Sequence, residues 1–281
     1  MSTSAPPAQS SSQAHAPGPV PGLDHIVDPN VHGNRNYWSK YDWPEAGDEW
    51  SKPWGGSENM WYCALFPRFR SFLPTGRILE IAPGFGRVTN YLRKYCEHID
   101  IVDLVPKCIE ACRQRFAGDN HIGYHVNDGR SLAMIPDNSV DFAISWDSLV
   151  HVEHETVREY LRQIATKLKP GAIGFIHHSN FGMQFDTIAH ELDKHVLGGR
   201  RPSMTAEKFR ADCKAFGLRC LSQELVPWTE PGLLIDSFSL FMRPHAGEDP
   251  SRWPEPTVIE RTDWGYEVAS AARIGSLYRR P

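Results

Sequence analysis

The chain of 281 residues lacks several features that would place it in other classes of protein. Its six cysteines form no C-x-x-C pair, so we expect reduced thiols in a cytosolic protein. No apolar run approaches the roughly 20 residues that a membrane-spanning helix needs, and no secretion signal is evident. The net charge of −4 gives no basic excess for nucleic acid. These absences predict a cytoplasmic protein with neither a membrane span nor a nucleic-acid partner.

Composition divides the chain into five expected segments. Its 41% hydrophobic and 23% charged residues are typical of a globular domain with additions. We expect a disordered tail over residues 1–35, where Ser, Ala, Pro and Gln are frequent. The remaining segments are a Trp-rich cap (36–75), a core (76–181), a lid region with the terminal strands of the sheet (182–245), and a Pro-rich C-terminal tail (246–281).

The cap is unusual for its aromatic content. Five tryptophans lie among Gly, Pro, Asp and Glu, with a spacing too irregular to predict a helix or a strand. The indoles either pack against the main domain or form an aromatic wall for a ligand, because Trp suits sugar faces and cations. These residues are Trp38, Trp43, Trp50, Trp54 and Trp61.

Residues 77–89 contain the most informative motif, R-I-L-E-I-A-P-G-F-G-R-V-T. It predicts a short strand, a tight turn with Gly84 and Gly86, and the start of a helix, so that the backbone can approach a nucleotide-like ligand. A dinucleotide fingerprint has a third glycine where this chain has Thr89. Glu80 would also repel a pyrophosphate, whereas it suits a ligand that carries positive charge.

The following residues alternate between strand and helix patterns. Apolar runs predict strands at 78–81, 99–104, 122–126, 140–146 and 172–177, and two further strands near 218–226 and 234–242. We therefore predict an α/β fold with a Rossmann-like, seven-stranded, mostly parallel sheet that has helices on both faces.

Polar residues occupy the ends of the predicted strands, where open α/β sheets bind ligands. Asp103 closes the second strand, and a carboxylate there can accept hydrogen bonds from both hydroxyls of a ribose. Asp128, next to Gly129, follows the third strand and can accept from an adenine amino group. The fourth strand ends in Ser145, Trp146 and Asp147.

This arrangement resembles the class I S-adenosylmethionine (SAM)-dependent methyltransferases over about residues 77–180. The matching segments are E-I-A-P-G-F-G, I-V-D-L, N-D-G, V-D-F-A-I-S-W-D-S-L-V-H-V and L-K-P-G-A. The segments I-A-P-G-F-G-R, S-W-D-S-L-V-H-V-E and F-I-H-H-S-N together are similar to a subgroup of bacterial glycan-modifying enzymes. One departure is Ala82, where the family usually has a glycine.

The resemblance implies S-adenosyl-L-methionine as the cofactor and residues 76–181 as its Rossmann-like binding core. It implies the following cofactor-binding residues: Glu80, Ala82, Gly84, Gly86, Asp103, Leu104, Asp128, Gly129, Ser145 and Trp146. The reaction would be methyl transfer to a nucleophile held in line with the methyl–sulfur bond.

A hydroxyl nucleophile would need a general base, and histidine suits that role at neutral pH. His151, after the fourth strand, is the first candidate, followed by His178 and then His177. Neighbouring residues of a strand point to opposite faces, so we expect only one of the last two to reach the site. Asp147 would orient a histidine or bind the substrate.

No metal site is expected. The fifth strand ends in His-His-Ser-Asn, which suits Mg²⁺ poorly. His151 and His154 have a helical spacing that could suit a transition metal, but the sequence indicates no third ligand.

The leading hypothesis is methylation of a hydroxyl of a sugar or another polyhydroxylated small molecule. The alternatives are an N- or C-methyltransferase of a natural product and a SAM-binding partner subunit without catalysis. The acceptor atom, its regiochemistry and the oligomeric state remain open at this point.

Overall fold

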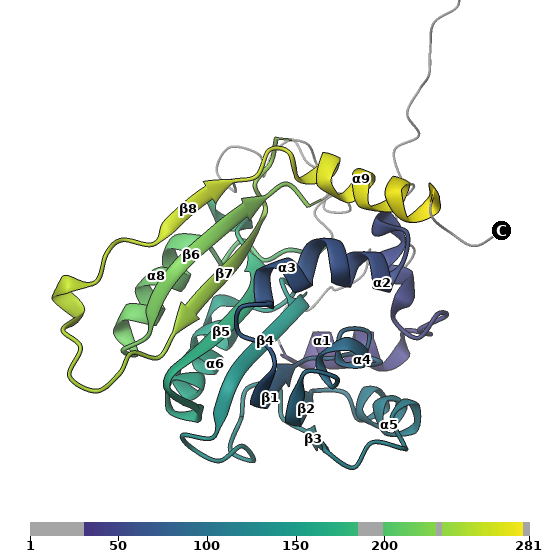
Figure 1. Cartoon of the computed structure of the whole chain (residues 1–281), viewed down its shortest axis with the longest axis horizontal. Coiled ribbons are helices and arrows are strands. Elements are labelled where there is room, and N and C mark those ends of the chain that lie inside the picture. Colours follow the sequence, from purple (N-terminus) through teal and green to yellow (C-terminus); the bar gives the residue numbers. More distant parts are fainter. Residues whose placement is uncertain (1–30, 185–198, 229–231, 278–281) are drawn as a thin grey trace, which may run out of the picture.

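The computed structural model describes residues 31–184, 199–228 and 232–277. A single eight-stranded sheet forms its centre, with the strand order β3-β2-β1-β4-β5-β7-β6-β8 (Figure 1). The strands are β1 (Thr75–Ile81), β2 (Cys96–Asp103), β3 (Ile122–Val126), β4 (Val140–Leu149), β5 (Leu168–Ser179), β6 (Arg219–Val226), β7 (Asp236–Met242) and β8 (Thr257–Glu260).

The sheet is mostly parallel, and its order defines where a ligand can bind. Strands β1 to β5 run in one direction, β7 is antiparallel to β5 and β6, and β8 is parallel to β6. The strand order reverses between β1 and β4, which makes the carboxyl ends of these strands the switch point of the fold.

Two hydrophobic clusters pack on opposite faces of the sheet. Along β1, Leu79 and Ile81 belong to one cluster and Ile78 belongs to the other, as the alternation of side chains along a strand requires. The first face is covered by α6 (His154–Lys167) and α8 (Ala206–Ala215). The second face is covered by α4 (Thr89–Leu92), α5 (Pro106–Arg115) and segments from both ends of the chain. The α/β fold is confirmed.

The cap is helical, which differs from the irregular structure expected of it. Helix α1 begins at Val31, inside the segment expected to be disordered; residues 1–30 lie outside the described part. The cap elements are α1 (Val31–Lys40), the 3-10 helix η1 (Asp48–Trp54), α2 (Ser57–Asn59), the π-helix η2 (Met60–Leu65) and α3 (Phe66–Phe69).

The prediction of seven strands is wrong, because the sheet has an eighth strand, β8, in the segment predicted to be a tail. This segment contains the 3-10 helix η4 (Pro250–Arg252), β8 and α9 (Trp264–Leu277). Arg68 of α3 explains its attachment: the guanidinium donates to Glu224 of β6 at 2.6 Å and contacts Glu267 of α9 at 3.4 Å. Helix α9 packs against the cap elements η1, α2 and η2 (Figure 1).

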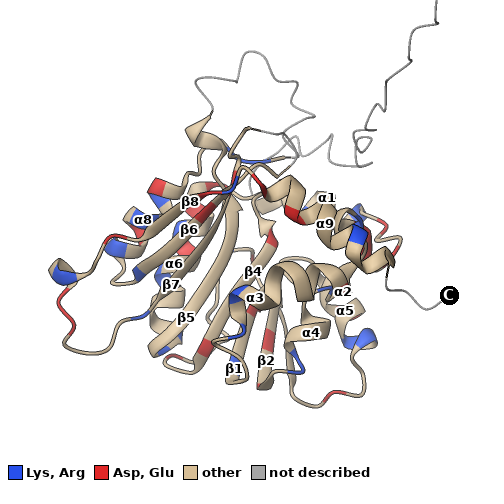
Figure 2. Cartoon of the chain, turned by 45° about the horizontal axis from the view of Figure 1, so that its top comes forward, with Lys and Arg blue, Asp and Glu red and all other residues tan. Residues whose placement is uncertain are grey.

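The lid expected within 182–245 falls largely on residues 185–198, outside the described part. Before it lies the 3-10 helix η3 (Phe181–Met183). Acidic and basic residues are interspersed along the ribbon (Figure 2). Within the described ranges, no helix is long and apolar enough to cross a membrane.

We predict that Trp264→Ala lowers the free energy of unfolding by about 3–5 kcal/mol, because the indole is 1% exposed within the core. Urea unfolding measures this loss. Tyr266→Ala is the matched control, since that ring is 78% exposed and its removal should change stability by at most about 0.5 kcal/mol. Equally small losses for both variants would show that α9 is not part of the core.

Candidate functional site

The turn between β1 and α4 requires its glycines. Gly84 and Gly86 have positive φ angles of 58° and 82°. A Cβ atom on Gly84 would lie 2.7 Å from Trp43 Cη2, and one on Gly86 would lie 2.6 Å from Phe116 Cε2. Ala82 has a φ of 57°, a left-handed conformation that costs an L-residue about 1–2 kcal/mol. The position where the resembled family has a glycine therefore adopts a glycine-like backbone here as well.

Two buried carboxylates lie beside this turn. Asp103 accepts hydrogen bonds from the backbone N–H groups of Gly84 (3.2 Å) and Val105 (2.8 Å). Glu80 accepts a hydrogen bond of 2.5 Å from the hydroxyl of Thr89. The residue in the place of a third glycine thus serves to orient a carboxylate.

Burial disfavours the charged forms of both carboxylates. It raises the pKa of Glu80 to about 7 and the pKa of Asp103 to about 6, although their hydrogen bonds act in the opposite direction. A cationic ligand beside them would favour the charged forms, so the pair suits a ligand with positive charge.

The end of β3 approaches the cap. Asp128 is exposed and accepts from the backbone of Arg130 and Ser131, so its carboxylate also closes a turn. Gly129 lies directly beneath α1: a Cβ atom there would lie 2.6 Å from Val31 Cγ1 and 3.1 Å from Leu104 Cδ1. A cavity of about 470 Å³ opens here, lined by Val31, His32, Arg35, Asp128 and Arg130.

The cap crosses the carboxyl ends of several strands. At the end of β3, Arg35 donates to the carbonyl of Asn127 at 3.3 Å. At the turn after β1, the ring of Trp43 stacks on Phe85 with a centroid separation of 4.6 Å. Beyond β4, Trp38 lies against the ring of His151 at 5.7 Å. The cap thus covers the edge of the sheet where the predicted site residues lie.

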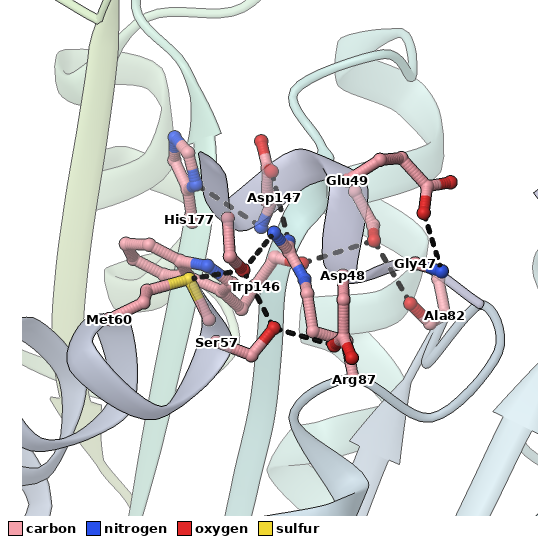
Figure 3. Close-up of polar contacts among 12 residues, drawn as sticks. Gly47, Asp48, Glu49, Ser57, Met60, Ala82, Arg87, Trp146, Asp147 and His177 are labelled. Carbon is pink, nitrogen blue, oxygen red and sulfur yellow. Dashed lines mark hydrogen bonds and ion pairs between the residues drawn. The ribbon is translucent and has the colours of Figure 1, made fainter. Parts of the chain in front are cut away.

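Asp147 and Arg87 meet beside the end of β4 (Figure 3). Arg87 donates to Asp147 Oδ2 at 3.0 Å and to the Ser51 hydroxyl at 3.1 Å. Ser145 and Trp146 are buried next to Asp147. Arg87 was not among the site residues predicted from the sequence, in which its only signal is its place directly after Gly86.

His151 is buried beneath the cap. Burial, together with the charges of Arg200 and Arg201, lowers the pKa of His151 to about 3. Its Nδ1 atom lies 3.4 Å from the carbonyl oxygen of Gly199. The imidazole is therefore unprotonated at neutral pH, but a group with so low a pKa is a weak base.

The side chain of His178 does not reach the carboxyl edge of the sheet, although His178 was predicted before His177 as a candidate base. Its ring stacks on Phe209 of α8 at 4.4 Å, on the other face of the sheet. Both nitrogens are occupied, since Nδ1 donates to the Ser179 carbonyl and Nε2 accepts from the Ser239 hydroxyl, each at 2.8 Å. His177 instead points toward Trp146 and Asp147.

The His151–His154 pair does not converge. His154 binds Asp212 of α8 at 2.7 Å, whereas His151 faces the cap. In the described parts of the chain, no group of three His, Cys, Asp or Glu side chains could hold a metal ion.

We predict that the stability of the ligand-free protein contains a component that falls as pH rises from about 4.5 to 7. Glu80 binds its proton more tightly in the folded chain than in the unfolded chain, so this component is complete below the unfolded pKa. Glu80→Gln should remove on the order of 3 kcal/mol of the pH dependence. Urea unfolding at several pH values measures it.

Exposed Glu97→Gln is the control, and its pH dependence should match that of the unaltered protein. If Glu80→Gln and Glu97→Gln gave the same curve, the carboxyl of Glu80 would not be protonated more readily in the folded chain.

Comparison with known proteins finds similarity over the core of the chain. Residues 78–171 match a family described as "Methyltransferase domain". Phosphoethanolamine N-methyltransferase 1 of Triticum aestivum is 32% identical over 151 residues, which cover 53% of this chain and 29% of the wheat protein. Nodulation protein S of Sinorhizobium fredii is 24% identical over 62% of this chain and 77% of its own length. The chain thus spans less than a third of the wheat relative.

Solved structures share the fold. A protein from Pyrococcus horikoshii has a TM-score of 0.54 and 15% identity, covering 74% of this chain and 98% of its own. The N-methyltransferase NodS from Bradyrhizobium japonicum has a TM-score of 0.53 and 15% identity, covering 77% of this chain and all of its own. Residues 78–171 of this chain are therefore similar to a methyltransferase domain, the solved structures share the fold, and these matches support SAM as the cofactor.

Proposed function

We propose that the chain catalyses methyl transfer from SAM to the nitrogen of a small amine. The observation that carries this proposal is the state of the three candidate histidines. His177 and His178 use both ring nitrogens in hydrogen bonds, and His151 has a pKa of about 3. A hydroxyl must lose its proton as the new bond forms, whereas a neutral amine attacks with its lone pair. A site without a strong base therefore favours an amine.

The residues beside the glycine-rich turn fit the cofactor. SAM supplies an electrophilic methyl group on a positively charged sulfonium. Glu80 and Asp103 are buried carboxylates with raised pKa values, so a cation beside them would offset the unfavourable burial of their charge. In this proposal they hold the cofactor together with Gly84 and Gly86. Leu104 directly follows β2, and Asp128 and Gly129 follow the adjoining strand β3, near Val31 of α1.

The acceptor would lie between the cap and the ends of β4 and β5. Asp147 supplies a carboxylate there that can accept a hydrogen bond from the neutral amine, and the ring of Trp38 supplies an aromatic face that attracts the positive charge developing on nitrogen as the methyl group is transferred. Two relatives, the wheat enzyme and NodS of Bradyrhizobium, are named as N-methyltransferases, and the solved NodS structure contains S-adenosyl-L-homocysteine. These names support nitrogen as the acceptor atom.

Methylation of a sugar hydroxyl, the leading hypothesis from the sequence, is the second candidate. His151 favours it in one respect, because the imidazole is unprotonated at neutral pH and so can accept a proton. The tryptophans of the cap would suit the face of a sugar ring. In either case, residues 36–75 would form a cap over the cofactor-binding core at 76–181.

We predict that the purified chain, given methyl-labelled SAM, methylates an amino sugar on nitrogen and leaves the parent sugar unmodified. Because only the neutral amine attacks, the rate should rise with pH through the pKa of the free amine. Mass spectrometry locates the methyl group. Methylation of both sugars on a hydroxyl would contradict the proposal, and SAM binding without transfer to any acceptor would favour the partner-subunit alternative.

Two variants separate the acceptor chemistries. His151→Gln should leave N-methylation within about tenfold, whereas loss of a general base would lower O-methylation roughly 10²–10⁴-fold. Asp147→Asn should raise the KM of the amine and leave SAM binding unchanged. Exposed Asp137→Asn is the matched control and should alter neither quantity. An unchanged KM in Asp147→Asn would remove that carboxylate from the acceptor site.

A further inference from the structure

Strand β4 departs from regular pairing with β5 at its carboxyl end. Ser145 pairs with Ile176 and Leu149 pairs with His178, so three residues of β4 lie opposite the single residue His177. Such a bulge re-aims side chains and is common next to active sites. Asp147 is the central residue of this bulge, and its φ of 53° is left-handed.

The His177 side chain takes the place of the missing backbone partner at the bulge. The backbone N–H of Asp147 donates to His177 Nδ1 at 3.1 Å (Figure 3). A left-handed conformation is unfavourable for a residue with a side chain, so it persists only where neighbouring contacts hold it. The hydrogen bond to the imidazole is such a contact.

The other side of the imidazole is anchored equally well. Since Nδ1 accepts the backbone proton, Nε2 carries the ring proton and donates to Asp236 Oδ2 at 3.0 Å. Asp236 in turn accepts two hydrogen bonds from Arg200, at 3.0 and 2.8 Å. His177 and Asp236 are fully buried, and the hydrogen bond from Nε2 to the buried carboxylate fixes the orientation of the ring.

The backbone conformation that His177 holds determines where the Asp147 carboxylate points. The backbone at Asp147 directs this side chain toward Arg87, which donates to Oδ2 at 3.0 Å. A different backbone conformation would turn the carboxylate away from the edge covered by the cap. Plain packing is the competing explanation, because His177 also contacts the rings of Trp146 and Trp228, at 4.9 and 4.7 Å.

We propose that His177 is a positioning residue: anchored by Asp236, it holds the bulge of β4 so that the Asp147 carboxylate faces the acceptor. Its role is exerted through the backbone N–H of Asp147 and does not involve proton transfer to the substrate. This proposal rests on the proposed function, in which Asp147 binds the amine.

Two substitutions separate the two hydrogen bonds of the ring. In His177→Asn, the side-chain oxygen takes the position of Nδ1 and can still accept from Asp147, but the contact with Asp236 is lost. In His177→Gln, the side-chain nitrogen takes the position of Nε2 and can still donate to Asp236, but the acceptor for Asp147 is lost. Both variants remove the imidazole from its aromatic neighbours, so a packing role would affect them alike.

The kinetic test measures the amine kcat/KM and the SAM dissociation constant of the full chain. We expect His177→Gln to lower kcat/KM roughly 100-fold, because a small misplacement of a positioning group can have an effect of this size. The kcat/KM of His177→Asn should remain within roughly tenfold of the value for the unaltered protein. SAM binding should be unchanged in both. His178→Gln controls for general destabilisation, because His178 lies on the opposite face of the sheet from His177. Its KM for the amine should equal that of the unaltered protein.

A second readout is independent of catalysis. Hydrogen exchange of the Asp147 amide should be faster in His177→Gln than in His177→Asn, because only the latter retains an acceptor. Equal exchange in the two variants would overturn the positioning role even if the protein is an amine methyltransferase. If exchange were faster in His177→Gln but the unaltered protein methylated no amine, the contact between His177 and the bulge would be supported. The proposed function would then be rejected.

Discussion

Exclusion of water from the carboxyl edge of the parallel sheet determines the chemistry of the groups gathered there. The aromatic cap lies over this edge, and burial is the main cause of each pKa shift at Glu80, Asp103 and His151. In each case burial favours the uncharged form. The site without ligand therefore holds carboxyls that protonate readily and an imidazole that does not. A cationic ligand would offset this burial, which links the fold to a sulfonium cofactor.

Two carboxylates in this region are paired with arginines. Arg87 joins Asp147 to the cap through Ser51, and Asp236 lies between Arg200 and His177. Such pairs add little stability compared with well-packed apolar side chains, but they fix orientation. They connect β4, β5 and β7 with the cap on the proposed acceptor side. The proposed cofactor side instead contains the backbone of the glycine-rich turn and Asp103.

Local patterns in the sequence predicted the order of strand β1, the glycine turn and helix α4. The strand, turn and helix around Gly84 depend on neighbouring residues, and parallel strands bring their carboxyl ends to one edge in any such sheet. Strand β8 was missed because Thr257–Glu260 is only four residues long and exposed along its whole length, so no alternation marks it. The cap helices were missed because Gly and Pro interrupt them and packing against the core stabilises them.

The acceptor side depends on contacts between distant segments, which sequence patterns do not record. Alternation along β5 predicts that one of two adjacent histidines faces the site, but the choice of His177 over His178 depends on the position of β5 between β4 and β7. The role of Arg87 is evident only from its hydrogen bonds to Ser51 and Asp147, which are 36 and 60 residues away in the chain. The bulge of β4 likewise appears only once the strands are paired.

Isothermal titration of the purified chain with SAM, and separately with NADH, tests the central claim most directly. The account predicts micromolar binding of SAM that is lost in Asp103→Ala, and no binding of NADH, because Thr89 and Glu80 replace the features that a pyrophosphate needs. Binding of NADH without binding of SAM would contradict the assignment of the cofactor and, with it, the proposed methyl transfer.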